Sequence, residues 1–374
     1  MSANAIKLFE KTAHNPSFYE VSAAVPTGQG VLDFCVPVNL HYPKERLLSE
    51  ITQNLSDIVK YYPDYACVHQ DHIARMIDLP AEAIIVANGS TEIITELVRT
   101  ADGPIVTCAP TFGQWTDLPP AFGKPVEFLF RTRADSFRLS VDQVIDRVRA
   151  VNGRMLVLSN PSNPTGVGMS LADIEEICSR LPDLQRIVID ESFIDFSDLE
   201  SAGLLAARSS NVIVVKSLGK TLGWHGLRLG YAVASEGIAR SLRGGMPYWN
   251  INGLAAFVLS RIADRPGDLA RSLAQTKCDR EAMIRELSRV EGLQVFPSQA
   301  NFVFGELTPD FSGDTLRKRL LARHGIFIRA CGNKIGSSNR YLRLAVTGPA
   351  AVNQLVGALR TELTASRQKA GCNA

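Results

Sequence analysis

Short β-rich runs that alternate with amphipathic helices constrain the fold of this chain more than any other feature. Seven runs are expected to form strands, at residues 83–87, 105–108, 126–130, 155–158, 187–189, 212–215 and 231–234. They are continuously apolar rather than alternating, which is typical of strands buried on both faces of a sheet. Helical periodicity between several of them, as in residues 171–180, therefore predicts an α/β fold with a mostly parallel central sheet covered by helices.

The pattern changes after about Asn250. A long helical stretch is expected at residues 251–289, and shorter elements are expected at residues 302–304, 315–323, 326–329, 341–346 and from 349 onward. Separated strands and helices of this kind predict a smaller α+β domain. We therefore expect a large domain over residues 41–250, a small domain over residues 251–374, and an N-terminal arm, residues 1–40, that joins the small domain.

Polar or glycine-rich residues follow four of the predicted strands. The four clusters are residues 88–91, 160–163, 190–191 and 216–220. Ligands of open α/β sheets bind at the carboxyl ends of the strands, so we expect the four clusters to face one pocket.

Residues in two of the clusters, with Arg228, suit an anionic ligand and covalent chemistry. Ser90 is expected to be the N-cap of a helix, and a helix N-terminus can bind a phosphate, although a capped helix needs no ligand. Lys220 lies beside glycines, where it is either a solvated loop charge or a desolvated amine that forms imines. Arg228, eight positions after Lys220, can bind a phosphate through two hydrogen bonds.

The other two clusters suit a heteroaromatic ring. Asn163 lies between two prolines that can hold its amide for a hydrogen bond to a phenolate-type oxygen, but a plain turn has the same composition. Asp190 ends an apolar run, where a carboxylate needs a partner. That partner is either the protonated ring nitrogen of a cofactor or a structural donor at a helix start.

Taken in order, these motifs resemble the class I and II aminotransferase family. The residues that carry the resemblance are 88–92, 110–112, 163–166, 190–191, and Lys220 with Arg228. The likeness extends from about Lys7 to Leu363 and is greatest to L-threonine-O-3-phosphate decarboxylases and histidinol-phosphate aminotransferases. It implies pyridoxal 5'-phosphate as the cofactor and the α/β architecture known as PLP fold type I.

The resemblance also implies roles for single residues. Lys220 is expected to hold the cofactor as a Schiff base, and further cofactor contacts are implied for Ser90, Thr91, Phe112, Asn163, Asp190, Arg228 and Tyr62. Tyr62 resembles a tyrosine that reaches the cofactor phosphate from a partner subunit, which implies a homodimer with shared active sites. Substrate contacts are implied for Arg343, Arg329, His14 and Asn39, and no metal ligand is expected.

The chain departs from its relatives in the residues expected to face the substrate. Pro37 stands in place of a substrate-facing asparagine, and Gly219 stands where a serine or threonine normally touches the cofactor phosphate. Trp224 and His225 replace small or apolar residues in the lysine loop. These departures predict a substrate different from those of both groups of relatives.

The resulting prediction is a PLP-dependent enzyme that acts through Lys220 at the Cα of an anionic amino acid, phosphorylated amino acids included. The reaction is either decarboxylation or transamination. Two alternatives stay open. One is elimination or cyclodehydration of a hydroxylated amino acid, such as hydroxyarginine, in a specialised biosynthetic pathway. The other is a regulator or scaffold that kept the fold without activity.

Net charge and cysteine content limit the kinds of partner and the cellular compartment expected for this chain. The formal net charge of +2 does not suggest a nucleic-acid partner, and no apolar stretch is long enough to cross a membrane. The seven cysteines form no Cys-x-x-Cys pair and no cluster at metal-ligand spacing. Reduced thiols in a cytoplasmic enzyme are therefore expected.

Overall fold

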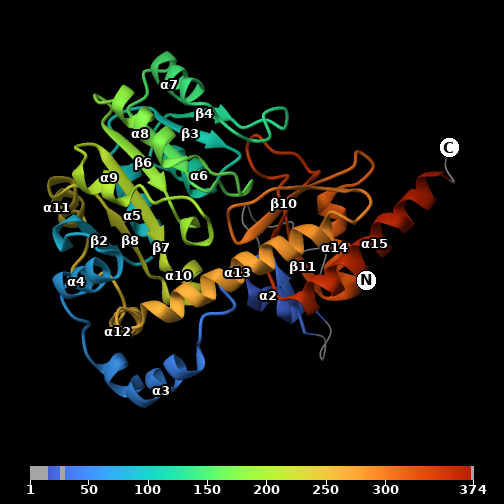
Figure 1. The fold of residues 1–374 in the computed structure, drawn as a ribbon, viewed down its shortest axis with the longest axis horizontal. Helices are drawn as coiled ribbons and strands as arrows, with labels where there is room; N and C mark the ends of the chain where they lie inside the picture. Colours follow the sequence, from blue (N-terminus) through green and yellow to red (C-terminus); the bar gives the residue numbers. More distant parts are fainter. Residues whose placement is uncertain (1–15, 26–29, 372–374) are drawn as a thin grey trace.

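The computed structural model describes residues 16–25 and 30–371, which form two sheets with flanking helices (Figure 1). The larger sheet has seven strands in the order β2-β8-β7-β6-β5-β3-β4. These are β2 (Ile84–Ala87), β3 (Ile105–Ala109), β4 (Val126–Phe130), β5 (Met155–Ser159), β6 (Arg186–Asp190), β7 (Val212–Ser217) and β8 (Gly230–Val233). Only β8 runs antiparallel to its neighbours, which confirms the predicted mostly parallel sheet.

Helices bury both faces of this sheet. One face packs against α4 (Ala66–Ile77), α7 (Val141–Ala150), α8 (Leu171–Arg180), α9 (Gly203–Arg208) and α12 (Gly253–Ile262). The other packs against α5 (Ser90–Arg99), α6 (Gln114–Ala121) and α11 (Glu236–Gly244). Strand β4 departs from the expected two-sided burial, because it lies at the sheet edge and stays half-buried.

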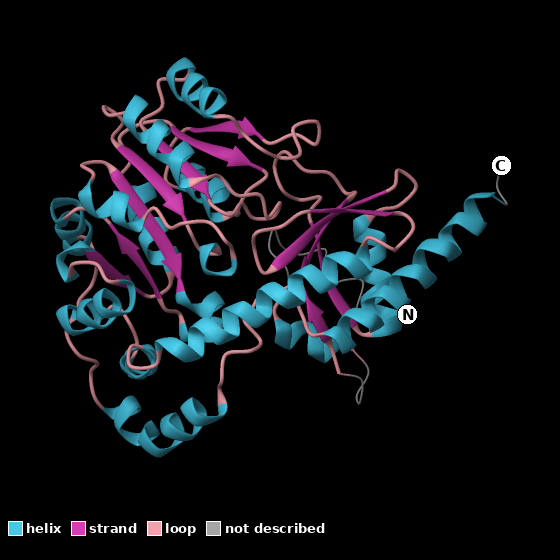
Figure 2. Cartoon of the chain, in the orientation of Figure 1, coloured by secondary structure: helices cyan, strands magenta, loops and turns pink. Residues whose placement is uncertain are grey.

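The smaller sheet has five strands in the order β1-β11-β12-β10-β9 (Figure 2). These are β1 (Leu32–Phe34), β9 (Leu293–Phe296), β10 (Phe302–Leu307), β11 (Ile326–Ala330) and β12 (Tyr341–Ala345). Its core includes residues of α13 (Pro266–Leu287), α14 (Gly313–His324) and α15 (Pro349–Gly371). The register pairs Arg329 on β11 directly with Arg343 on β12, so the two predicted substrate arginines are neighbours.

The helical stretch expected over residues 251–289 is divided in the structure. The structure has two helices there, α12 and α13, because Pro266 lacks an amide hydrogen and begins a new helix at its first position. Strand β1 pairs in parallel with β11, so the segment before residue 40 contributes to the smaller sheet. The domain limits at residues 40 and 250 stay a prediction, and α12 packs into the core of the larger sheet.

The remaining helices are short or peripheral. They are α2 (Phe18–Ala24), α3 (Glu45–Lys60), α10 (Leu218–Thr221), η1 (Ala81–Ala83), η2 (Ile194–Phe196) and η3 (His225–Leu227). Helix α3 lies at the margin of the molecule, at the bottom of Figure 1. Across the described part of the chain, every helix is too short or too polar to cross a membrane.

Candidate active site

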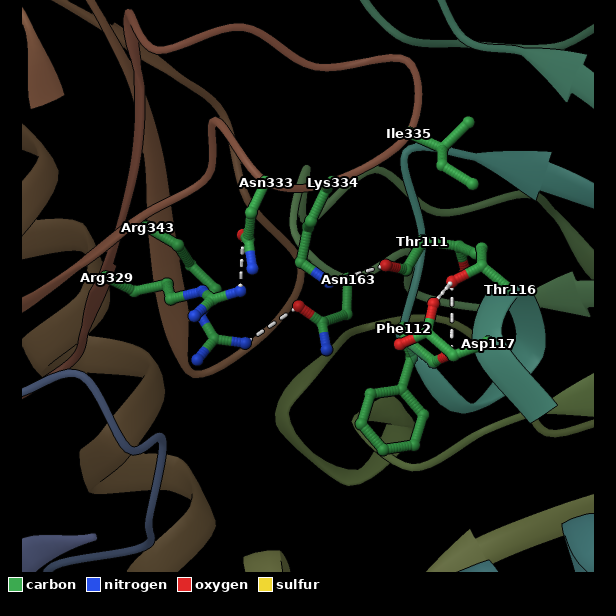
Figure 3. A pocket seen from close by; sticks show the side chains of 11 residues that line it. Thr111, Phe112, Thr116, Asp117, Asn163, Arg329, Asn333, Lys334, Ile335 and Arg343 are labelled. Atoms are coloured by element: carbon green, nitrogen blue, oxygen red, sulfur yellow. Dashed lines mark hydrogen bonds between the residues drawn. The ribbon is translucent and has the colours of Figure 1, made fainter. Parts of the chain in front are cut away.

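Two cavities meet near the carboxyl ends of the larger sheet's strands, and they share Phe112 and Asn163. The first, here called the lysine cavity, is lined by these two residues together with Ser159, Pro161, Asp190, Ser192, Phe193 and Lys220. The second, here called the cationic cavity, has a volume of about 210 Å³. Figure 3 shows its side chains, which include Arg329, Lys334 and Arg343.

Lys220 lies in the short helix α10, directly after β7. Burial is the main cause that lowers the pKa of its amine to about 8; Asp190 opposes the shift, and Arg343 and Arg228 add to it. The Nζ atom lies 5.0 Å from the centre of the Phe193 ring, an apolar surface. A lysine held this way is neutral more often than a solvated lysine, which is what a nucleophilic amine requires.

Asp190 is held by two donors. The indole Nε1 of Trp115 donates to Oδ2 at 2.9 Å, and the backbone N–H of Ser192 donates to Oδ1 at 3.1 Å. An indole N–H can only donate, so both contacts suit an ionised carboxylate. Trp115 is fully buried on α6 and was not among the residues predicted for the site.

The start of α5 forms a cradle for an anion. The prediction that Ser90 is the N-cap is wrong, because Gly89 occupies that position and Ser90 begins the helix. None of the described side chains caps this first turn, so its amides are available to a ligand. Arg228 donates to Thr91 Oγ1 at 2.9 Å, and a Cβ on Gly89 would lie only 2.7 Å from the Arg228 guanidinium. Gly230 is similarly required, since its Cβ would lie 2.5 Å from the Ser90 nitrogen.

Asn163 and the two arginines connect the sheets. Arg343 donates to Asn163 Oδ1 at 2.8 Å and to the Cys35 carbonyl at 2.7 Å. The oxygen of the Asn163 amide is therefore used, and its nitrogen is the part that can donate to a ligand. Arg329 donates to Asn333 Oδ1 at 2.8 Å, on the same side of the cationic cavity (Figure 3).

Asn39 lines neither cavity, and its predicted substrate contact stays a prediction. Its side chain is fully buried and donates to the Thr221 carbonyl and to Ser272 Oγ, both at 2.9 Å. Its backbone N–H donates to the Lys220 carbonyl at 3.1 Å. Asn39 therefore positions the lysine helix, because its amide nitrogen is bonded within the protein and none of it reaches a cavity.

One further predicted residue lies apart from the cavities. Tyr62 is 80% exposed, and its ring lies 4.8 Å from that of Trp249 at the surface. It lines neither cavity of its own chain. His14 lies outside the described residues.

The departures noted in the sequence meet in one place. The imidazole Nε2 of His225 lies 3.0 Å from the Pro37 carbonyl, which can only accept, so this nitrogen carries the hydrogen. Burial, followed by the charge of Lys220, lowers the pKa of His225 to about 4, so the ring is neutral. A Cβ on Gly219 would lie 3.3 Å from the Trp224 carbonyl and 3.4 Å from His225 Cα. A side chain at position 219 would therefore require residues 224–225 to shift slightly.

A second network beneath Lys220 was also missed by the sequence analysis. Lys216 Nζ lies 2.5 Å from Asp195 Oδ1, and Thr221 Oγ1 donates to Asp195 Oδ2 at 2.8 Å. These contacts hold the residue that follows Lys220. The only sequence signal was an aspartate five positions after Asp190 in the same loop.

Comparison with known proteins agrees with this geometry. The family model described as aminotransferase class I and II matches residues 38–359. The L-serine phosphate decarboxylase of Sulfurospirillum multivorans is 31% identical, over 95% of this chain and 94% of that protein. A solved decarboxylase structure from Sulfurospirillum multivorans has a TM-score of 0.87 and 28% identity, and covers 96% of this chain and 95% of that chain.

Another solved structure bears on the cofactor. Histidinol-phosphate aminotransferase from Sinorhizobium meliloti, in complex with pyridoxal 5'-phosphate, has the same fold, with a TM-score of 0.82, 21% identity, and coverage of 95% of this chain and 96% of that chain. The donor set described above fits this cofactor. The α5 cradle suits its phosphate, Asn163 its ring oxygen, Asp190 its ring nitrogen, and Lys220 its aldehyde carbon.

The lowered pKa of Lys220 predicts how cofactor-free protein takes up pyridoxal phosphate. The neutral amine reacts, so the uptake rate should rise with pH and level off above about 8, instead of rising to the ordinary lysine value near 10.5. Stopped-flow absorbance across pH 6–10 measures this profile. A rate that still climbs steeply between pH 9 and 10 would contradict the environment described for Lys220.

The Trp115→Phe substitution tests the support of Asp190. The variant keeps the apolar ring and loses the donor, so we expect cofactor affinity and kcat/KM to fall about tenfold or more, as for loss of a hydrogen bond to a charged group. Absorbance titration and steady-state kinetics measure the effect, and a melting curve checks that the fold is kept. Unchanged affinity in a folded variant would show that Ser192 alone suffices.

Proposed function

The chain belongs to the class I and II aminotransferase family, and we propose that it decarboxylates a small amino acid with a phosphorylated side chain, O-phospho-L-serine being the first candidate. It is a PLP-dependent enzyme of the decarboxylase and aminotransferase type. The observation that carries the proposal is the positive charge of the cationic cavity. The alternative of a scaffold without activity is set aside, because the relatives are named as enzymes.

The cations of this cavity have few protein anions to neutralise them. The hydrogen bonds of Arg343 go to the neutral oxygens of Asn163 and Cys35, and that of Lys334 goes to the carbonyl of Thr111. Asp117 is the one carboxylate among the described lining residues, and it is exposed. Partly buried cations that hydrogen-bond to neutral oxygens, as Arg343 and Lys334 do, are stabilised further by an anionic ligand. The volume of about 210 Å³ is below that of pockets for drug-sized ligands, so the ligand is small.

The relatives support the same substrate chemistry. The protein of Sulfurospirillum multivorans is named an L-serine phosphate decarboxylase, and it covers nearly the whole chain. Its substrate carries a carboxylate and a phosphate, which together match a cavity with three cations. A guanidinium side chain such as that of hydroxyarginine would meet these cations, so charge argues against the cyclodehydration alternative.

The residues around Lys220 favour loss of the carboxylate. When bound, pyridoxal phosphate takes up the electron pair left at Cα when a bond there breaks. The Asp190 carboxylate would pair with the positive charge of the cofactor's ring nitrogen. Phe193 presents an apolar ring that gives no donor to a carboxylate, so the change from carboxylate to neutral carbon dioxide is favoured there. Lys220 Nζ is placed to return a proton to Cα, which completes the formation of an amine.

We also propose that the enzyme is a homodimer with shared active sites. Three exposed tyrosines gather beside Trp249, namely Tyr62, Tyr65 and Tyr248, and the neighbouring Tyr61 is exposed too. Helix α3 adds the exposed apolar residues Leu48, Leu55 and Val59. An apolar surface of this extent is typical of a protein–protein interface. A second copy seated on it would bring Tyr62 toward the partner's cofactor phosphate, its expected place.

Product analysis separates the possible reactions. With O-phospho-L-serine, we expect the holoenzyme to release carbon dioxide and phosphoethanolamine, and to form no glutamate when 2-oxoglutarate is added. Mass spectrometry and a coupled glutamate assay measure both products. Lys220→Ala should lower the rate by at least about a thousandfold. Glutamate formation would identify a transaminase, and no product of either kind would refute the proposed substrate.

A charged substitution at the expected interface tests the proposed dimer. Val59→Asp should shift the protein to a monomer in analytical ultracentrifugation, since an unpaired carboxylate is excluded from an apolar interface. A mixture of Lys220→Ala and Tyr62→Ala chains should recover part of the activity, because one mixed site carries both native residues. Dimers unaffected by Val59→Asp, or a mixture as inactive as its components, would contradict shared sites on this surface.

A further inference from the structure

We propose that Lys334 determines specificity for a doubly charged side chain, by binding the substrate's phosphate together with Arg329 at the end of the cationic cavity away from Lys220. The inference rests on the proposed function and adds a residue to it. Nothing in the sequence pattern pointed to Lys334, which lies in an irregular loop between β11 and β12.

The loop that carries Lys334 is held in place by backbone hydrogen bonds. Cys331 N–H donates to the Tyr341 carbonyl at 2.8 Å, which closes the base of the loop. Within it, the Lys334 N–H donates to the Cys331 carbonyl and the Ser337 N–H to the Lys334 carbonyl, both at 3.0 Å. These two consecutive turns direct the Lys334 side chain down into the cavity, as Figure 3 shows.

The loop also packs against the larger sheet. Gly336 adopts a φ of +73°, and a Cβ there would lie 3.2 Å from the carbonyl carbon of Ala109 and 2.9 Å from the Phe130 ring. The Lys334 amine donates to the Thr111 carbonyl at 2.6 Å, beside Phe112. The loop therefore spans from the smaller sheet to the larger one, and the lysine is positioned before any substrate arrives.

The lining residues order the cations along the cavity. Arg343 donates to Asn163, which lines both cavities, whereas Arg329 and Lys334 line the cationic cavity and not the lysine cavity. Arg343 is thus the cation nearest the junction of the two cavities. A substrate with its Cα at Lys220 and its carboxylate beside the Phe193 ring extends its side chain past Arg343 toward Arg329 and Lys334.

Charge decides what the far end selects. A phosphate monoester carries a charge of about −1.5 to −2 at neutral pH, whereas a side-chain carboxylate carries −1. Arg329 alone matches a carboxylate, and Arg329 with Lys334 matches a phosphate. An ammonium has three donors, and one of them already reaches Thr111, so the others can turn to the phosphate oxygens.

Asp117 on α6 is the carboxylate at the opposite wall. It accepts from Thr116 Oγ1 at 2.6 Å, and its charge acts on Lys334 more weakly than burial and the two arginines do. Asp117 is exposed, so solvent screens it from the cavity. The far end is therefore net positive, which suits a phosphate better than an amine.

The test compares Lys334→Met with a matched control, Lys124→Met. Lys124 makes the same kind of contact, an amine donating to the Ala101 carbonyl at 2.7 Å, but lines neither cavity. Binding of O-phospho-L-serine and of L-serine to the holoenzyme is followed by the cofactor absorbance. We expect Lys334→Met to weaken O-phospho-L-serine about 10- to 100-fold, as for a lost charge-assisted hydrogen bond, with L-serine binding unchanged. Lys124→Met should leave the binding of both ligands unchanged. Lys334→Arg should retain most of the preference for O-phospho-L-serine over L-serine.

The outcomes separate the inference from the proposed function. If the native holoenzyme shows no absorbance change with O-phospho-L-serine, the proposed substrate is wrong. If the native enzyme binds it but Lys334→Met loses both ligands equally, or loses neither, Lys334 does not select the phosphate. A rise in KM with kcat altered by less than about threefold supports a binding role, whereas a fall in kcat alone would overturn it.

Discussion

The guanidinium of Arg343 is the interaction on which the active site depends. It rises from β12 in the smaller sheet, donates to Asn163 in a loop of the larger sheet, and donates to the Cys35 carbonyl just after β1. Its carbon atom also lies 5.3 Å from the centre of the Phe302 ring. Three separate segments thus meet at one cation. Both hydrogen-bond acceptors of Arg343 named above are neutral oxygens. Arg343 therefore joins the two sheets, and its positive charge can still attract an anionic ligand.

The segment from Cys35 to Asn39 extends this connection to Lys220. Its carbonyls at Cys35 and Pro37 accept from Arg343 and His225, and Asn39 donates to the Lys220 carbonyl. The departures from the relatives fall in this segment and in the loop it touches, so they lie together in the fold. The neutral His225 lies beside Gly219. Glycine lacks the hydroxyl that the serine or threonine of the relatives has at this position. In the proposed site, the groups that would hold the cofactor phosphate are then the amides of α5, Thr91 and Arg228.

The sequence predicted what depends on local pattern. Seven apolar runs became the seven strands of one sheet, and Asp190, Asn163 and Lys220 were identifiable because each lies at or just beyond the carboxyl end of a strand. Trp115 and Lys334 were not, since their partners lie 75 and 223 positions away and only the fold brings them together. Ser90 was misassigned for a local reason: Gly89 can adopt the φ of +76° that begins the helix one residue earlier. The break in the helical stretch at Pro266 is also local, because proline begins α13 at its first position.

Burial lowers the pKa of both Lys220 and Lys334 to about 8, yet the two lysines use this shift in opposite ways. For Lys220, loss of the proton is useful, because only the neutral amine can act as a nucleophile. For Lys334 the charged form is the useful one, and Arg329 and Arg343 work against it. A phosphate that binds between these three cations raises the pKa of Lys334 again, since an adjacent anion favours the ammonium. The free protein therefore holds Lys334 near its titration point, and the substrate's own charge completes the site that binds it.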